Sequence, residues 1–423
     1  NPLVCEGCGD CSVQSNCLSV EPLETEFGRK RKINLNTCNK DFSCLDGFCP
    51  SFVTVEGAIR TRREGADVDA SSLCAALPTP VLPPLAEPFD LLVTGVGGTG
   101  VVTVGALVTM AAHLEGLGSS VLDFTGFAQK FGTVLSYVRL GKSPEAIHQV
   151  RIGQGAADAV IGCDIVVSSA AKASVHYRKG TGVVLNRAEM PTGDLVLHRD
   201  ASLKVDAREA VIRQAVGDEN VHGFDANAVA EALLGDSVFA NVMMLGFAWQ
   251  RGLVPVSEVA LKQAILLNGV AVDKNARAFD FGRVMAHDPE KLMPAPVVPS
   301  VQTAQDLIQA RSAFLTDYQN AAYAQRYVST LARFGASLSD DTREVLLSTA
   351  ARALFKLMSY KDEYEVARLH TQTGFDDKIS EQFEGDYRIQ YHMAPPVLSS
   401  GRDARGRPKK RAFGQWMRPV LGG

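Results

Sequence analysis

The chain has 423 residues and a formal net charge of −4, with 46% hydrophobic and 21% charged residues. This length predicts two or three domains rather than one. The near-balanced charge gives no indication of a nucleic-acid partner, and the longest apolar run, 101–112, is too short to span a bilayer. The first residue is not Met, and we expect the chain to be part of a longer polypeptide.

Cysteines dominate the start of the chain. Seven of the nine lie in the first 49 residues, and the other two are isolated further on. A cysteine-rich block in front of a large α/β body favours metal thiolates in a reducing cytoplasm over disulfides of a secreted module. The seven are Cys5, Cys8, Cys11, Cys17, Cys38, Cys44 and Cys49.

The spacing of these cysteines favours iron–sulfur clusters. The block reads C-x2-C-x2-C-x5-C, then, after twenty residues, C-x5-C-x4-C-P. Bacterial ferredoxins use C-x2-C-x2-C-x3-C-P, in which the cysteine before proline ligates the other cluster. The second half lacks its middle cysteine, and Asp41 stands there. The alternative is structural zinc, whose four-cysteine sites usually come as two separated C-x2-C pairs.

This pattern predicts two ligand sets in a ferredoxin-like module, residues 1–56. The first cluster takes Cys5, Cys8, Cys11 and Cys49. The second takes Cys17, Cys38 and Cys44, with Asp41 or a water at its fourth iron. Because a carboxylate binds this iron more weakly than a thiolate, we expect the second cluster to lose iron and reach a three-iron form. A linker, 57–87, follows and includes the proline-rich LPTPVLPPLAEP.

An α/β domain is predicted over residues 88–283. A buried strand, Leu91–Thr94, precedes a glycine turn, Gly95–Gly100, and then a helix, 101–115, and a second strand, Val121–Phe124. The turn satisfies G-x-G-x-x-G, and Asp123 follows at the distance of a ribose-binding acid. The pattern leaves three interpretations open: an NAD or FAD site, a site for another phosphate ligand, or close packing alone. The glycines are Gly95, Gly97, Gly98 and Gly100.

Further strands at 133–139, 159–168 and 182–186 extend an open, mostly parallel α/β sheet, and helices follow at 229–251 and 256–278. Residues 284–423 are predicted to form a mainly helical domain. One helical face joins Leu307, Ile308, Phe314, Leu315, Tyr318 and Ala322. A capping box at Asp341 and Glu344 would open a second long helix running through YKDEYEVARLH, with Tyr360, Tyr364 and Arg368 on a packing face.

Two basic stretches, 29–32 (RKRK) and 402–411 (RDARGRPKKR), are interpreted first as solvated surface. The alternatives are docking of an acidic electron carrier or capture of an anionic substrate. A turnover rate that depends on salt would separate these from the first interpretation.

The motifs VCEGCGDCSVQSNC, CNKDFSC, GVGGTGVVTVG, YKDEYEVARLH and GRPKKRAFG together resemble the C-terminal part of the long, fused bacterial form of indolepyruvate ferredoxin oxidoreductase. This family belongs to the thiamine-dependent 2-oxoacid:ferredoxin oxidoreductases. The resemblance covers essentially the whole chain and makes residues 88–283 a γ-type domain. It implies oxidative decarboxylation of an arylpyruvate such as indolepyruvate, with coenzyme A as co-substrate. The clusters would pass electrons singly to ferredoxin.

The resemblance also revises the glycine turn. A γ domain is not a nicotinamide domain, so the turn would pack the sheet or accept an anionic group such as a coenzyme A phosphate. Gln129 and Lys130, in TGFAQKFG, are candidates to face the active site. A self-contained NAD(P)-linked iron–sulfur oxidoreductase and a zinc-stabilised scaffold without redox role are the remaining alternatives.

No G-D-G motif for thiamine diphosphate and Mg²⁺ occurs, and Gly235-Asp236-Ser237 is the nearest approach. We therefore expect the thiamine-binding domains upstream in the same polypeptide, and a chain unable to decarboxylate by itself. The expected partners are those domains, ferredoxin and further copies of the chain, with neither nucleic acid nor membrane.

Overall fold

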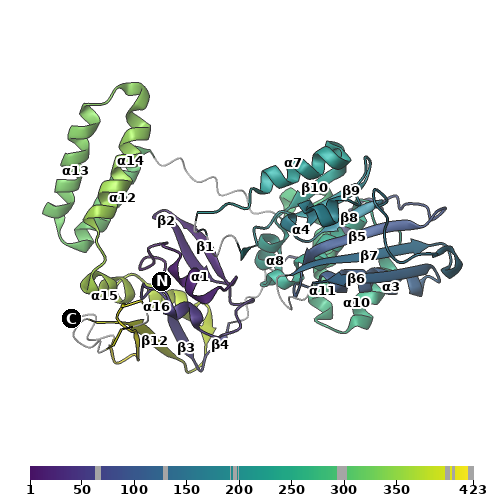
Figure 1. Cartoon of the computed structure of the whole chain (residues 1–423), viewed down its shortest axis with the longest axis horizontal. Coiled ribbons are helices and arrows are strands. Elements are labelled where there is room, and N and C mark those ends of the chain that lie inside the picture. The colour runs from purple at the N-terminus through teal and green to yellow at the C-terminus, as the bar shows by residue number, and fades with distance from the viewer. Residues whose placement is uncertain are drawn as a thin grey trace. The chain divides into compact units, whose positions relative to one another are not determined.

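The computed structural model describes residues 1–61, 68–126, 132–190, 192–193, 198, 200–292, 303–395, 401–402 and 405–417. The chain divides into two compact units (Figure 1). One is an α/β unit of residues 62–296, and the other, the cysteine-bearing unit, joins residues 1–61 to residues 297–423. The two ends of the chain thus build one unit. The boundaries predicted at residues 56, 87 and 283 stay predictions.

A six-stranded sheet in the order β10-β9-β8-β5-β7-β6 forms the centre of the α/β unit. Strands β5, β8, β9 and β10 run parallel, whereas β7 is antiparallel to both β5 and β6. This confirms the predicted open, mostly parallel α/β fold. The strands are β5 (Phe89–Val96), β6 (Gly118–Thr125), β7 (Thr133–Gly141), β8 (Ala159–Gly162), β9 (Gly182–Asn186) and β10 (Val221–Phe224).

Helices cover both faces of this sheet because its central strands are apolar on both sides. Alternate residues of a strand point to opposite faces. On β5, Leu91 and Val93 join the cluster formed with α3 and α8 to α11, while Leu92 joins the cluster formed with α4 and α7. The helices are α2 (Ala70–Ala75), α3 (Val101–Leu114), α4 (Ile165–Ser169), α5 (Ala171–Ser174), α7 (Val205–Val216), α8 (Ala226–Leu234), α9 (Ala240–Gln250), α10 (Glu258–Asn268) and α11 (Val272–His287).

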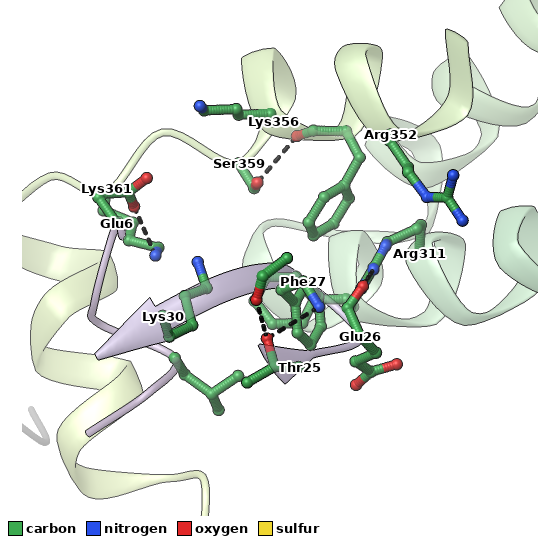
Figure 2. Close-up of a pocket in the computed structure, with 14 residues that line it drawn as sticks. Glu6, Thr25, Glu26, Phe27, Lys30, Arg311, Arg352, Lys356, Ser359 and Lys361 are labelled. Atoms are coloured by element: carbon green, nitrogen blue, oxygen red, sulfur yellow. Dashed lines mark hydrogen bonds and ion pairs between the residues drawn. The ribbon is translucent and has the colours of Figure 1, made fainter. Parts of the chain in front are cut away.

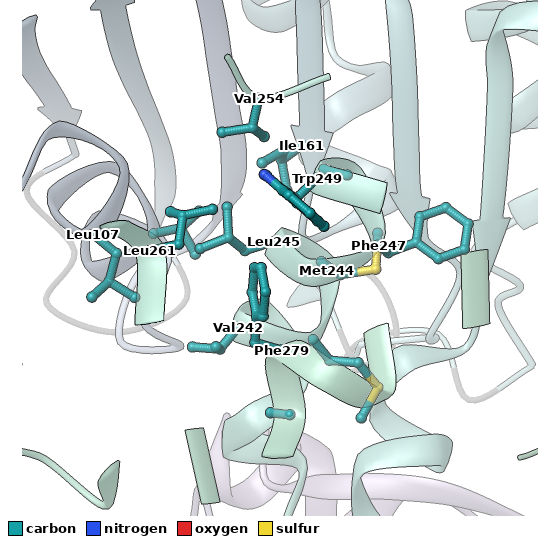
Figure 3. Packing of buried hydrophobic residues seen from close by; sticks show 14 of the residues in the cluster. Leu107, Ile161, Val242, Met244, Leu245, Phe247, Trp249, Val254, Leu261 and Phe279 are labelled. Carbon is teal, nitrogen blue, oxygen red and sulfur yellow. The ribbon is translucent and has the colours of Figure 1, made fainter. Parts of the chain in front are cut away.

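Helices α9 and α11 cross in very close contact within the larger cluster. A Cβ added at Gly246 would collide with the backbone oxygen of Phe279, and one at Gly282 with the backbone oxygen of Met243. Figure 3 shows Phe279 and Trp249 inside this cluster, and the Trp249 indole N–H donates to the Val256 oxygen at 2.8 Å. Glycine on both helices therefore allows their backbones to touch.

Three predictions for this unit are wrong at specific residues. The strand predicted over 159–168 ends at Gly162, because Asp164 accepts a hydrogen bond from the Val167 N–H at 2.7 Å and caps α4. The helices predicted over 229–251 and 256–278 are each two helices. Gly235 and Gly269, at φ 80° and 71°, end α8 and α10 in the left-handed conformation.

In the cysteine-bearing unit, strands from the two ends of the chain pair with each other. Its sheets have the orders β1-β2, β13-β12-β3 and β11-β4, so strands after the cysteine block pair with strands near the C-terminus. A ferredoxin-like fold for residues 1–56 stays a prediction. The elements are α1 (Asp10–Ser15), β1 (Val20–Thr25), β2 (Gly28–Ile33), the 3-10 helix η1 (Ser43–Asp46), β3 (Val53–Glu56), β4 (Ile59–Arg60), β11 (Phe383–Glu384), β12 (Arg388–Met393) and β13 (Arg411–Phe413).

The C-terminal part is helical up to residue 380, as predicted, and Leu307, Ile308 and Leu315 of its first helix are buried. The capping box predicted at Asp341 and Glu344 does not form, and no side chain of the described residues caps the helix that begins at Asp340. A capping box forms instead between Thr303 and Asp306, at the start of the helix Ala304–Tyr318, and Glu344 accepts from the Ala304 N–H at 2.5 Å. The helices are α12 (Ala304–Tyr318), α13 (Ala321–Ala336), α14 (Asp340–Met358), α15 (Glu363–Thr371) and α16 (Phe375–Ser380).

The second long helix does not run through YKDEYEVARLH, because α14 ends at Met358 and a new helix, α15, begins at Glu363. Tyr360 and Tyr364, predicted on a packing face, are 73% and 86% exposed. Among the described residues, no helix combines the length and apolar character that crossing a membrane requires.

Candidate metal centre in the cysteine-bearing unit

Four thiols from the two ends of the cysteine block influence one another, two of them through a hydrogen bond and the others through their charges. Cys5 and Cys49 share a hydrogen bond, which raises the pKa of Cys5 and lowers that of Cys49 to about 5. Burial raises the pKa of Cys11 to about 11, and the charges of Cys49 and Cys8 raise it further. These are the four residues that the spacing assigns to the first cluster, and their ligation of it stays a prediction.

A second group of thiols surrounds η1. Burial raises the pKa of Cys44 to about 12, followed by the charges of Cys11, Cys38 and Cys17. The Lys40 amide donates to the Cys38 sulfur at 3.4 Å. Cys17, Cys38 and Cys44 are thus electrostatic neighbours, as a shared cluster would need, and Cys11 links this group to the first.

Asp41 is exposed and held in a local turn. Its carboxylate accepts from the Ser43 amide at 3.1 Å and from the Ser43 hydroxyl at 2.9 Å, and these bonds lower its pKa. Its proposed place as a ligand of the second cluster stays a prediction.

The described residues contain no group of three His, Cys, Asp or Glu side chains that could share a single metal ion. In a cubane, each thiolate binds a different iron at a separate corner. Cysteines placed for a cubane therefore need not converge on one point. The two thiol groups fit such a spread ligand set by residue type and by their mutual contact.

Hydrogen-bond donors surround the thiols. The Gly7 amide donates to the Cys5 sulfur at 3.3 Å, and the Cys49 sulfur lies 3.1 Å from the Ser51 hydroxyl. Iron–sulfur clusters carry negative charge and are tuned by donors of this kind. The donor set present therefore suits an anionic cluster.

Lys410, which is distant in sequence, holds the second half of the cysteine block through hydrogen bonds. Its ammonium group donates to the backbone oxygens of Leu45 at 2.9 Å and Cys49 at 2.7 Å, and also to that of Gly47. Burial lowers its pKa, and the charges of Cys49 and Cys11 act in the opposite direction. A cation therefore lies beside the loop that carries the C-P motif.

Ion pairs fix the first half of the block in the same way. Arg407 pairs with Asp10 at 2.8 Å, and Asp10 also accepts from the Phe48 amide at 2.7 Å. Lys361 pairs with Glu6 at 2.5 Å and donates to the Cys5 oxygen at 3.3 Å. Residues from the C-terminal part thus position the cysteine loops.

A buried histidine contacts the residue after Cys49. The Nε2 atom of His370 lies 3.1 Å from the Pro50 oxygen, and the ring is fully buried. Burial lowers the His370 pKa to about 4. The neutral imidazole therefore donates from Nε2 and helps to hold the C-P turn.

The basic stretches are not simply solvated surface, as the first interpretation had them. Lys30 and Arg31 are only 6% and 5% exposed, and Lys410 and Arg407 contact the cysteine loops. Sequence reasoning missed these four residues because a run of charged residues usually lies on the solvent-exposed surface. The signal available was that the first run lies between the two cysteine halves.

The glycine turn of the α/β unit combines close packing with left-handed backbone. A Cβ at Gly95 would come within 2.5 Å of Val101 and 3.0 Å of Cys163, so this glycine packs the strand against α3. Gly98 and Gly100 have φ of 84° and 92°, which favours glycine. The Gly97 amide donates to the Gly132 oxygen at 2.7 Å.

The sheet order argues against the nicotinamide interpretation. Asp123 pairs with Ser136 on β7, and Ser136 pairs with Val93 on β5. Strand β7 thus separates Asp123 from the strand that enters the glycine turn, by about 10 Å for two strand spacings. In a dinucleotide fold the acidic residue follows the neighbouring strand. The other candidates, Gln129 and Lys130, lie outside the described residues.

Two family models match separate parts of the chain. Residues 90–284 match the model of a family described as "Pyruvate ferredoxin/flavodoxin oxidoreductase", and residues 304–423 match a family of unknown function, DUF6537. "Indolepyruvate oxidoreductase subunit IorB" of Thermococcus kodakarensis is 28% identical over 196 residues, which are 46% of this chain and 94% of the relative. The protein of the same name from Pyrococcus horikoshii is 28% identical over 197 residues, again 46% and 94%.

Two solved structures are similar to part of the chain. Pyruvate oxidoreductase subunit PORC of Thermotoga maritima has a TM-score of 0.35 and 17% identity, and covers 47% of this chain and 96% of its own. The keto/oxoacid ferredoxin oxidoreductase gamma subunit of Geobacter sulfurreducens has a TM-score of 0.34 and 20% identity, and covers 47% and 98%.

The family match covers the α/β region that contains the glycine motif. Residues 90–284 therefore match the pyruvate ferredoxin/flavodoxin oxidoreductase family, and indolepyruvate oxidoreductase subunits are among the relatives to which the chain is similar.

Proposed function

We propose that this chain is the electron-transfer and γ portion of an oxidoreductase that acts on arylpyruvates such as indolepyruvate. The substrate would be decarboxylated and joined to coenzyme A, while two electrons leave one at a time to ferredoxin. The similarity of the chain to IorB proteins supports the substrate class. The gathering of seven cysteines into two neighbouring groups, braced by Lys410 and Lys361, is the observation that carries the electron-transfer role.

We propose Cys5, Cys8, Cys11 and Cys49 as ligands of one cluster, and Cys17, Cys38 and Cys44, with Asp41, as ligands of the other. When bound, the clusters would accept and release single electrons. The chain's own groups hold the thiols in place, donate hydrogen bonds to sulfur and offset negative charge. Cys11 contributes to the electrostatics of both groups, so the two clusters would be close neighbours.

Metal analysis of the full chain, purified without oxygen, tests this proposal. We expect about eight irons with matching acid-labile sulfide and a brown colour. Stoichiometric zinc in colourless protein, without sulfide, would overturn the redox role.

The place of Asp41 needs its own test. We expect a three-iron EPR signal in the oxidised protein, which Asp41→Cys should suppress by completing the ligand set. Asp46→Ala, which removes another exposed carboxylate of the same loop, is the matched control and should change nothing. If no three-iron signal forms and Asp41→Ala leaves the spectra unchanged, Asp41 is not a ligand.

The thiamine diphosphate and Mg²⁺ of the reaction would be held by domains upstream in the same polypeptide. The isolated chain should therefore show no 2-oxoacid oxidation by dye reduction, and appreciable turnover would contradict the proposal. For the glycine turn we propose packing together with contact to an anionic group of coenzyme A. Calorimetric titration with coenzyme A and NADH tests it, and tight binding of NADH alone would refute it.

A further inference from the structure

A cavity of about 530 Å³ lies within the cysteine-bearing unit, between the β1–β2 hairpin and helices α12 and α14 (Figure 2). This volume is within the range of small-molecule sites. Lys361 and Glu6, which also hold the first cysteine loop, are among its lining residues, and no cysteine lines it.

The lining carries an excess of positive charge. Five cationic and two carboxylate side chains line the cavity, and Lys361 already pairs with Glu6. Like charges lie near one another: burial lowers the pKa of Lys30, the charges of Lys361 and Lys356 also lower it, and those of Glu6 and Cys5 act in the opposite direction. An anion in the cavity would relieve this repulsion. The cations are Lys30, Arg311, Arg352, Lys356 and Lys361.

Arg311 lacks partners for two buried donors. It is 3% exposed, and its guanidinium carbon lies 3.8 Å from the Phe27 ring centre and 4.8 Å from that of Phe355. One nitrogen donates to the Glu26 oxygen, but Nε and Nη1 have no hydrogen-bond partner within the described structure. Buried, unpaired donors on a charged group are costly. Their presence beside the cavity indicates a missing acceptor.

The part of the lining next to Arg311 is apolar and aromatic. Phe27, Phe314 and Phe355 contact one another with ring centres 5.3 to 5.7 Å apart, and Leu3 completes this part of the lining. A simple inorganic anion would leave this surface unused. The ligand therefore combines a flat or apolar group with at least two negative charges.

We propose that this cavity binds a nucleoside diphosphate, either free or as the corresponding part of a larger cofactor. Arginine and lysine together suit phosphate oxygens, because the guanidinium fork binds two of them and the ammonium groups add charge. The aromatic part of the lining would take the base. The proposal does not depend on the iron–sulfur assignment, because no cysteine lines the cavity.

Titration of the full chain with ADP tests the proposal. We expect one ADP per cavity, with an affinity that falls as salt rises. Pyrophosphate should compete, at least tenfold more weakly, and adenosine should not bind measurably. Competition by coenzyme A at the same cavity would identify the larger cofactor as the source of the diphosphate, whereas failure of coenzyme A to compete would identify a free nucleotide.

Variants assign binding to this cavity rather than to the glycine turn. Lys356→Gln and Arg352→Gln alter exposed lining residues and should each weaken ADP binding at least fivefold. Arg326→Gln removes an exposed cation of neighbouring α13 that does not line the cavity, and should leave binding unchanged. Arg311→Lys retains the charge but loses the fork, and circular dichroism would confirm that it folds.

No binding of ADP at millimolar concentration would overturn the proposal. So would binding that is equally strong in Lys356→Gln, Arg352→Gln and the unaltered chain, or ADP binding that pyrophosphate cannot displace. Iron and sulfide content serves as an independent readout and should be the same in all of these variants.

Discussion

The α/β unit and the cysteine-bearing unit are stabilised in different ways. The α/β unit buries two large apolar clusters, one on each face of its sheet. The cysteine-bearing unit divides its apolar side chains among three smaller clusters. Burial of apolar area is the main stabilising contribution in folding. The second unit therefore depends more on its polar contacts and on what its thiols bind.

The contacts of Lys410, Lys361 and His370 add to the smaller apolar clusters of the cysteine-bearing unit. Each donates to a backbone oxygen next to a cysteine or within a cysteine loop. Such groups orient the loops without supplying much apolar burial. We infer that bound metal contributes folding free energy here, as in other small metal-binding modules, and that the α/β unit needs none.

Loss of one thiol gives the largest expected effect. Cys49→Ala should remove about half of the iron and loosen residues 1–61, with amide exchange there rising about tenfold or more. Strands β5 to β10 should keep their exchange rates. Iron analysis and hydrogen exchange measure both. Cys74→Ala, which removes a buried thiol of the α/β unit, is the matched control and should retain all iron. An equal rise of amide exchange in both units would refute the inference that bound metal stabilises only the cysteine-bearing unit.

The α/β unit should instead be sensitive to its buried ion pair. Arg139 binds Asp90 through two hydrogen bonds of 2.6 and 3.0 Å, with side chains 12% and 4% exposed. Arg139→Met leaves a buried carboxylate unpaired and should cost about 3–5 kcal/mol in the free energy of unfolding. Urea unfolding followed by hydrogen exchange in β5 and β7 measures it.

The double variant Asp90→Leu with Arg139→Met should recover most of this loss, because no charge is then left unpaired. Iron content should remain that of the unaltered chain in both variants. A cost below about 1 kcal/mol for Arg139→Met would mean that the pair is effectively solvated.

Packing of α9 on α11 offers a third test. Gly246→Ala places a methyl group against the backbone oxygen of Phe279, and a helix backbone cannot move as a side chain can. We expect a cost of about 1–3 kcal/mol, even though alanine is the better helix former. Gly153→Ala, whose added Cβ would meet its nearest neighbour at 3.6 Å, is the control and should stay within about 0.5 kcal/mol. If Gly246→Ala and Gly153→Ala change the free energy of unfolding by the same amount, the contact between α9 and α11 is loosely packed.

The sequence predicts the two units unequally well. Apolar runs such as those of β5 and β9 predict buried strands, and the structure shows both strands buried. Local turn chemistry accounts for the errors: Asp164 starts a helix where apolar residues suggested a strand, and Gly235 ends one. Such capping competes with periodicity over only a few residues, so a pattern read over longer windows misses it.

For the candidate site, spacing identified the thiols but not the groups that hold them. Lys410 and Arg407 lie more than 350 residues from the loops they contact. Nothing local in a basic run indicates such a pairing, because the same residues suit solvent equally well. The pairing of β12 with β3, which joins segments near the two ends of the chain, could likewise not be predicted from a local sequence pattern.

Protonation of His370 gives the smallest expected effect and falls on the cysteine-bearing unit. Its folded pKa of about 4 lies below the ordinary value of about 6.5, so the unfolded chain binds the proton more readily. The His370 contribution to stability is therefore present above pH 6.5 and is lost as the pH falls toward 4. Between pH 7 and 5 we expect a loss of about 1–2 kcal/mol, measured by hydrogen exchange in residues 363–393.

His370→Gln separates this effect from the acid lability of bound clusters. Glutamine can still donate to the Pro50 oxygen but does not titrate, so the variant should be less stable at pH 7 and lose less stability on acidification. The buried ring also contacts Phe375 and Tyr391, with ring centres 5.4 and 5.2 Å away, which explains the lower starting point. If both proteins lose stability equally between pH 7 and 5, the acid sensitivity of this unit does not come from the histidine.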